Sequence, residues 1–173
     1  MNEKEFATFA MALRSYYPRE KILPSDEAMD LWFMELKDIP FNIAQAGLRK
    51  WVSTNKWSPS IAEIREMTTS ITLGEIPDWG EAWKEVQFAI RRYGRYEARK
   101  GIESLSPLTR QTVERIGFNN LCISENESAD RANFRMIYEQ LAERKKKDAQ
   151  MPMTLKMLIA KVQSNNLIED KND

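Results

Sequence analysis

The sequence predicts an all-α protein with an N-terminal four-helix unit, a second helical unit and an amphipathic C-terminal tail helix. Apolar residues recur at intervals of three and four along most of the chain, which is the spacing of one helix face. Residues that favour helices dominate long stretches, whereas Gly and Pro number only six and seven in 173 residues. With 42% apolar and 30% charged residues the chain can build a hydrophobic core, so disorder throughout is not expected.

Four helices are predicted in residues 1–68, and we expect them to form a compact N-terminal domain. Each has its apolar positions on one face, as helices that share a core do. Residues that stop or cap helices mark the borders of the first three: Pro18, Pro24, Ser25, Asp38, Pro40 and Asn55.

The fourth helix begins within the stretch KWSPSIAEIREM (56–67). Ser60 is followed three residues later by Glu63, which is the pattern of a capping box. Ile61 and Ile64 give this helix a narrow apolar face. That face indicates a helix that closes the bundle.

DNA recognition by this fourth helix is the alternative, because the helix before it would complete a helix-turn-helix. Its outer side chains would be Glu63, Arg65 and Glu66. Two carboxylates beside one arginine oppose binding to phosphates. We therefore favour bundle closure.

The second half of the chain is predicted to be a separate helical domain. Residues 69–78 contain Thr, Gly and Pro, and indicate a linker, with one short strand as the alternative. Residues 79–150 form the predicted C-terminal domain. Capping and terminating residues mark its borders and those of its helices: Asp78, Gly94, Ser106, Pro107, Gly117 and Pro152.

Residues 151–173 are predicted to be an amphipathic tail that is partly flexible. Such a helix is a candidate ligand for a groove on another protein, and packing on its own domain is the alternative. Trp57, in the turn before Pro59, is either a staple that fixes the turn or an exposed anchor for a partner. The candidate partner-binding residues are Leu155, Leu158, Ile159, Val162, Met157 and Trp57.

A basic segment in the second half is a candidate contact for nucleic acid. The net charge is −3 over residues 1–78 and +3 over 79–150, although it is zero for the whole chain. Arginines that alternate with aromatic rings can follow a single strand by charge and stacking. The alternative is a solvated face with Tyr93 in the core. The candidate residues are Arg91, Arg92, Arg95, Tyr96, Arg99 and Lys100.

The sequence indicates no enzyme, so no catalytic, cofactor-binding or metal-binding residue is assigned. It has no histidine, no phosphate-binding glycine loop and no Cys-x-x-Cys motif. Asp26, Glu27 and Asp30 lie together at the start of a helix, where acids compensate the helix dipole more often than they bind a metal ion.

The chain is expected to act inside the cell, in solution. Its single cysteine, Cys122, suits a reducing compartment. The N-terminal residues MNEKEFATF do not have the features of a signal peptide, and no apolar run approaches the roughly 20 residues of a membrane span.

The stretch PSDEAMDLWFMELKDIPFNIAQAGLRKWVSTNKWSPSIAEIREM (24–67) resembles the phage proteins that load and inhibit the replicative helicase. The resemblance lies in the initial PSDE, in LWFMELKDI, in the Ala/Leu/Trp helix followed by TNK, and in SPSIAEIRE. The segments DWGEAWKEVQFAIRRYGRY, LSPLTRQTVERIGF and SENESADRANFRMIYEQLAERKKKDAQMP are similar to the second halves of phage replication proteins of this kind, so the resemblance extends over 78–152.

This resemblance implies an all-helical N-terminal domain, no ATPase activity and a C-terminal region that contacts a hexameric replicative helicase. Such proteins hold the helicase inactive, bring it to an origin marked by a phage initiator and release it onto single-stranded DNA. The short family members have a brief flexible C-terminal region, whereas this chain has a helical second half, so the location of the helicase contact stays open.

We therefore expect a phage DNA-replication adaptor in the cytoplasm of a bacterial host. Its expected partner is the replicative DNA helicase, with a phage origin-binding initiator or the host helicase loader as further candidates. Two alternatives stay open, namely an inhibitor that binds the host helicase loader and a DNA-binding regulator of replication or transcription. Direct contact with nucleic acid is expected to be weak or indirect, and contact with membranes is not expected.

Overall fold

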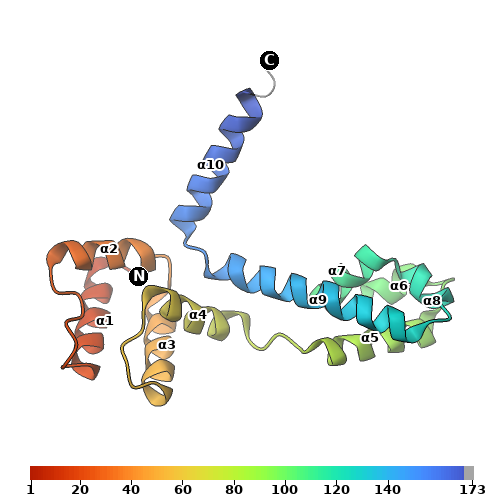
Figure 1. The fold of residues 1–173 in the computed structure, drawn as a ribbon, viewed down its shortest axis with the longest axis horizontal. Coiled ribbons are helices and arrows are strands. Elements are labelled where there is room, and N and C mark those ends of the chain that lie inside the picture. The colour runs from red at the N-terminus through yellow and green to blue at the C-terminus, as the bar shows by residue number, and fades with distance from the viewer. Residues whose placement is uncertain (170–173) are drawn as a thin grey trace. The chain divides into compact units, whose positions relative to one another are not determined.

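The computed structural model describes residues 1–169, and all regular secondary structure in that range is helical (Figure 1). The predicted all-α class is therefore confirmed. Packing divides the described chain into two compact units. Unit 1 consists of residues 1–74 and the described residues from 148 onward, and unit 2 consists of residues 75–147.

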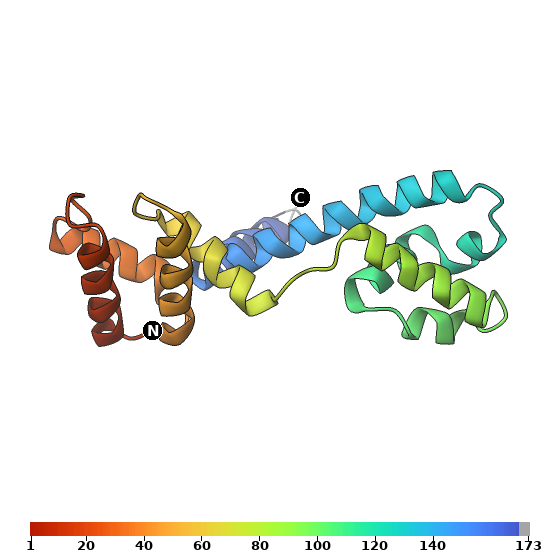
Figure 2. The same ribbon diagram turned by 90° about the horizontal axis from the view of Figure 1, so that it is seen from below.

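Unit 1 contains α1 (Glu3–Tyr16), α2 (Asp26–Leu36), α3 (Phe41–Thr54) and α4 (Ile61–Leu73). α3 packs against both α1 and α4 (Figures 1 and 2). The core forms where the apolar faces of these four helices meet, as their spacing predicts. Its fully buried side chains include Phe9, Leu13, Leu36, Ala44 and Ile64.

Side-chain caps set the beginnings of these helices. The predicted capping box at α4 is confirmed: Ser60 Oγ accepts a hydrogen bond from the Glu63 N–H at 3.3 Å, and Glu63 Oε2 accepts one from the Ser60 N–H at 2.7 Å. Ser25 caps α2 as predicted, and Asn2 and Glu5 form a further box at α1. Each cap satisfies backbone donors that the first helical turn leaves without partners.

α4 is longer than the sequence indicated, because it continues through the first half of the predicted linker to Leu73. Thr68 and Thr69 lie buried in this extension, and the Thr68 hydroxyl donates to the Arg65 carbonyl at 3.0 Å. Packing and this bond outweigh the low helix propensity of β-branched residues. Gly74, at φ 67°, ends the helix, and the alternative of a short strand is not realised.

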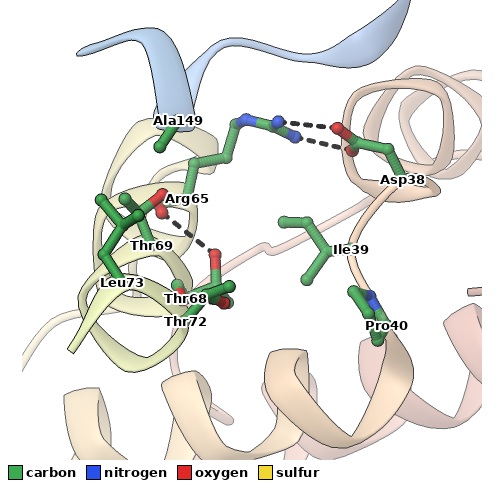
Figure 3. A pocket seen from close by; sticks show the side chains of 9 residues that line it. All are labelled: Asp38, Ile39, Pro40, Arg65, Thr68, Thr69, Thr72, Leu73 and Ala149. Atoms are coloured by element: carbon green, nitrogen blue, oxygen red, sulfur yellow. Dashed lines mark hydrogen bonds and ion pairs between the residues drawn. The ribbon is translucent and has the colours of Figure 1, made fainter. Parts of the chain in front are cut away.

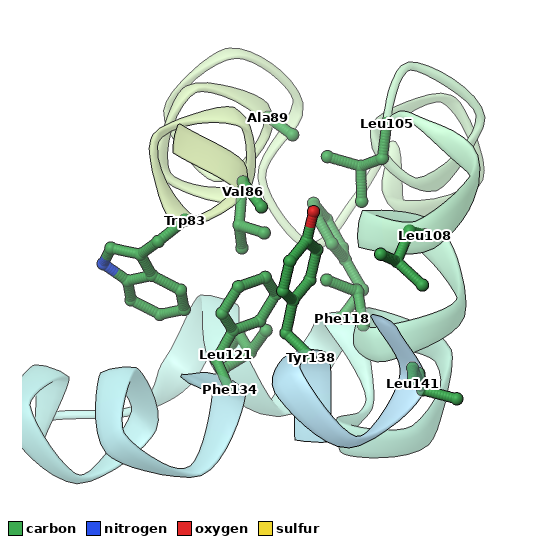
Figure 4. Packing of buried hydrophobic residues seen from close by; sticks show 12 residues of the cluster. Trp83, Val86, Ala89, Leu105, Leu108, Phe118, Leu121, Phe134, Tyr138 and Leu141 are labelled. Carbon is green, nitrogen blue, oxygen red and sulfur yellow. The ribbon is translucent and has the colours of Figure 1, made fainter. Parts of the chain in front are cut away.

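Unit 2 contains α5 (Trp79–Tyr93), α6 (Ala98–Glu103), α7 (Pro107–Ile116), α8 (Phe118–Ile123) and most of α9 (Glu127–Gln150). These helices enclose a second core, shown in Figure 4. Its aromatic centre stacks in sequence, because the rings of Trp83 and Phe134 are 5.2 Å apart and those of Phe134 and Tyr138 are 5.6 Å apart. The Tyr138 hydroxyl donates to the Pro77 carbonyl at 2.9 Å.

The tail begins after Pro152 as helix α10 (Met153–Glu169). All side chains of residues 153–164 are exposed. The last four residues of the predicted flexible end, 170–173, lie outside the described part of the chain. Across residues 1–169, none of the helices has the length and apolar character needed to span a membrane.

Candidate partner-binding surfaces

A buried arginine holds the base of the tail helix on unit 1. Arg65 of α4 is only 6% exposed, and its guanidinium forms two hydrogen bonds of 2.9 Å with the carboxylate of Asp38, as Figure 3 shows. The same guanidinium donates to the carbonyls of Glu35 and Gln150. One side chain therefore joins the end of α2 to the end of α9, just before the tail.

Asp38 in turn caps the tail helix from outside it. Its Oδ2 accepts a hydrogen bond of 3.1 Å from the backbone N–H of Met153, the first residue of α10. A carboxylate at this place satisfies an otherwise unpaired donor and lies at the positive end of the helix dipole. Burial alone raises the pKa of the Asp38 carboxyl, but the hydrogen bonds from Arg65 and Met153, and the charge of Arg65, outweigh it and hold the pKa below its usual range.

A small pocket lies beside this junction, within unit 1. It has a volume of about 180 Å³, and Figure 3 shows the side chains that line it. Its lining is mixed, since Ile39 and Leu73 are apolar whereas Arg65 and three threonines of α4 are polar. Because Asp38 and the main-chain carbonyls already occupy the Arg65 guanidinium, the pocket offers no free charge to a ligand.

The predicted apolar stripe of the tail is exposed. Leu158 is 58% exposed, and the other three members, Leu155, Ile159 and Val162, are 37–51% exposed. Met157 is exposed as well, but 3.6 residues per turn place it roughly on the opposite side of the helix from the stripe. α10 therefore presents apolar side chains on more than one side, with its base fixed by Arg65 and Asp38.

The Trp57 side chain is 74% exposed, so the interpretation of this residue as a staple is wrong. Its backbone does that work, because the Trp57 carbonyl accepts a hydrogen bond of 2.8 Å from the indole N–H of Trp51. Ser58 adds a second tie through bonds from its N–H and hydroxyl to the Glu20 carboxylate. The turn is thus fixed by polar contacts, and the Trp57 ring faces solvent.

A groove of about 510 Å³ lies next to this turn, between residues 20–24 and 58–60 and the first half of α2. One wall contains Leu23, the only non-glycine residue of the described chain with positive φ (53°). The Arg14 guanidinium donates to the carbonyls of Ile22 and Leu23 and so supports this unusual conformation.

The six candidate nucleic-acid residues fall into two groups. Arg91, Arg92, Arg95 and Tyr96 lie at the end of α5 and in the turn after it, and all four are exposed. The remaining two, on α6, are neutralised by carboxylates: Arg99 pairs with Glu103 and Lys100 pairs with Glu97. Tyr93 packs partly against the unit 2 core, as the alternative interpretation expected.

Two features of these surfaces were missed in the sequence. Arg65 was placed on the outer face of its helix, but it points inward and binds Asp38. The signal was present, because Arg65 follows the core residue Ile64 directly and lies one turn beyond Ile61, at the edge of the apolar face. Phe88 was also missed; it is 60% exposed on α5, one turn before Arg91 and Arg92.

Among the described side chains, no group of three or more Cys, Asp or Glu is placed to hold a metal ion. Asp26 and Glu27 occupy the first turn of α2, next to the cap Ser25. A hydrogen bond from the Ser25 side chain is the main cause that lowers the pKa of Glu27. Burial raises the pKa of the Cys122 thiol, which disfavours the reactive thiolate form.

Residues 1–65 match the family model for the N-terminal domain of a phage helicase loader and inhibitor. Neither the curated proteins nor the solved structures contain a match to the chain. The matched residues comprise α1 to α3 and the start of α4, and they include most of the segment whose sequence resembles the phage helicase loaders. Over its first 65 residues this chain is therefore similar to that N-terminal domain, which supports the phage helicase-loader family for that part of the chain.

Proposed function

We propose that the protein is a phage DNA-replication adaptor that binds a hexameric replicative helicase, holds it inactive and controls its loading onto DNA. The match of residues 1–65 to the N-terminal domain of the phage helicase loaders carries this proposal. The adaptor role requires binding surfaces rather than catalytic groups, and exposed apolar surfaces of this kind mark protein contacts.

The apolar stripe of α10 is the proposed helicase contact. Burying a leucine, isoleucine or valine side chain contributes about 1.5–3 kcal/mol, and the stripe offers four of them before the costs of association. Arg65 and Asp38 fix the base of the helix, so less conformational freedom is lost when it binds. Trp57, exposed on a rigid turn, is the proposed second anchor, because aromatic residues are common at the centres of interfaces.

Co-purification with a hexameric helicase from the same phage or its host tests the function. We expect a stable complex on size-exclusion chromatography and reduced unwinding by the bound helicase, measured with and without ATP. Failure to form any complex would contradict the proposal. Capture of the host helicase loader in place of the helicase would favour the inhibitor alternative.

Substitution of the stripe tests the place of contact. The double variant Leu155→Ser, Leu158→Ser should weaken helicase binding at least tenfold and leave the melting temperature nearly unchanged, because both side chains are exposed. Leu31→Ser is the matched control, since Leu31 is an exposed leucine (62%) on α2 of the same unit. Full binding by the double variant, with loss of binding by Trp57→Ala, would move the contact to the turn.

A further inference from the structure

Two exposed aromatic rings lie at the end of α5 and in the turn that follows. Phe88 is 60% exposed and Tyr96 is 90% exposed. Phe88 comes two residues after Val86, which is fully buried, so the core that holds one side of α5 leaves Phe88 on the other. Exposed rings of this size forgo the free energy of burial, so they indicate a surface with a use.

Three arginines stand among these rings. The Arg92 guanidinium lies 6.0 Å from the centroid of the Phe88 ring, and that of Arg95 lies 5.1 Å from the centroid of Tyr96. Arg91 follows Phe88 by three residues and therefore lies on the same side of α5. Among the described ion pairs, none involves any of these three arginines, so their charge is available to an anion.

The turn after α5 brings the second ring and its arginine next to the first. Gly94 ends the helix at φ 56°, a backbone conformation that glycine adopts without strain. We define the aromatic–arginine patch as Phe88, Arg91, Arg92, Arg95 and Tyr96. It excludes Arg99 and Lys100, because carboxylates on either side of them compete with phosphates.

From this arrangement we propose that the aromatic–arginine patch binds single-stranded nucleic acid. Arginines bind successive phosphates, and exposed rings provide faces on which unpaired bases stack. A duplex keeps its bases stacked inside and can use only the charges. The patch contains no neutral amide and a single hydroxyl, so it has little means to recognise a ribose 2′-OH and should accept DNA and RNA alike. The proposal does not depend on helicase binding, since the patch lies in unit 2.

Fluorescence anisotropy with the full-length protein and a labelled oligo-dT of about 20 nucleotides tests this site. We expect a dissociation constant on the order of 10–100 μM at about 50 mM salt, which is the range of contacts to the phosphate backbone. Three free arginines predict a slope of about −2 when the logarithm of the binding constant is plotted against that of the salt concentration. Oligo-U should bind within about threefold of oligo-dT, and a duplex of equal length should bind more weakly.

Paired variants separate stacking from charge. Phe88→Ala with Tyr96→Ala keeps every charge and should weaken oligo-dT binding at least about fivefold. Both side chains are exposed, so circular dichroism should show an unchanged fold. Lys145→Ala with Lys146→Ala is the charge control, because it removes two exposed cations of unit 2 far from the patch in sequence. It should change binding less than about twofold.

Three results would overturn the proposal. The first is no binding of oligo-dT at low salt. The second is equal loss of binding in the ring variant and in the lysine control, which would indicate charge without a site. The third is unchanged oligo-dT binding with loss of helicase capture in the ring variant, which would assign the patch to a protein partner.

Discussion

Arg65 shows how one residue can decide where a distant segment of the chain lies. Its guanidinium binds Asp38 through two hydrogen bonds and also reaches the carbonyl of Gln150, 85 positions further along. The planar group fits a carboxylate with both nitrogens, which a lysine ammonium cannot do. Asp38 in turn binds the first backbone N–H of the tail helix. These two residues therefore position the proposed helicase contact without belonging to it.

Replacing Arg65 by Met should lower the free energy of unfolding of unit 1 by at least about 2 kcal/mol. The substitution leaves Asp38 and two main-chain carbonyls without their donor, and breaking a largely buried ion pair is costly. Urea denaturation measures the loss. Arg49→Met, at an exposed arginine of α3, is the control and should change stability little. Equal stability of the two variants would show that the ion pair contributes nothing.

The Asp38 pair also predicts a dependence on pH. The pKa of Asp38 is lower in the folded protein than in the unfolded chain, where it is about 3.9, so its contribution is complete above about pH 4 and is lost as pH falls through the folded value. Asp38→Asn should therefore be less stable than the wild-type protein at pH 6, and the difference should shrink below pH 4. Urea denaturation across this range tests the sign. A difference that stays constant down to about pH 2.5 would refute it.

At the scale of elements, close approach between helices matters as much as helix propensity. α6 crosses the ring of Phe118 at Gly101, where an added Cβ would lie 2.5 Å from the ring edge. Gly101 is buried and Phe118 is 3% exposed, so neither can move easily. The glycine in the middle of α6, which lowers helix propensity, is explained by this contact.

Gly101→Ala should destabilise unit 2 by about 1–3 kcal/mol, although alanine favours helices. The clash with Phe118 outweighs the gain in propensity, and thermal denaturation followed by circular dichroism will show it. Phe118→Leu in the same chain makes room for the methyl group, so the double variant should lose less than the sum of the two single variants. Simple additivity would mean that the two residues do not interact.

At the scale of the whole molecule, the two units have different relations to the sequence. Unit 2 is one continuous segment with its own core, whereas unit 1 combines the N-terminal helices with the tail. The chain passes from one unit to the other at residues 74–75 and again at 147–148.

Residues 75–147 should therefore fold alone. Their core includes residues from all five helices and needs none from unit 1, and compact segments of this size fold independently when they enclose their own core. The isolated fragment should be mainly helical and should unfold in one cooperative thermal transition. A fragment that lacks a cooperative transition would show that unit 2 depends on the rest of the chain.

The sequence by itself determined the fold class, the helix borders and the inward faces, because caps, helix-ending residues and the spacing of apolar residues act within one or two turns. Ser60 with Glu63 and the stop at Gly94 are examples. Tertiary structure alone decided the pairing of Arg65 with Asp38, the exposure of Trp57 and the grouping of the tail with unit 1. The physical reason is that each of these depends on contacts between distant segments, and local periodicity cannot show which partner a border residue will reach.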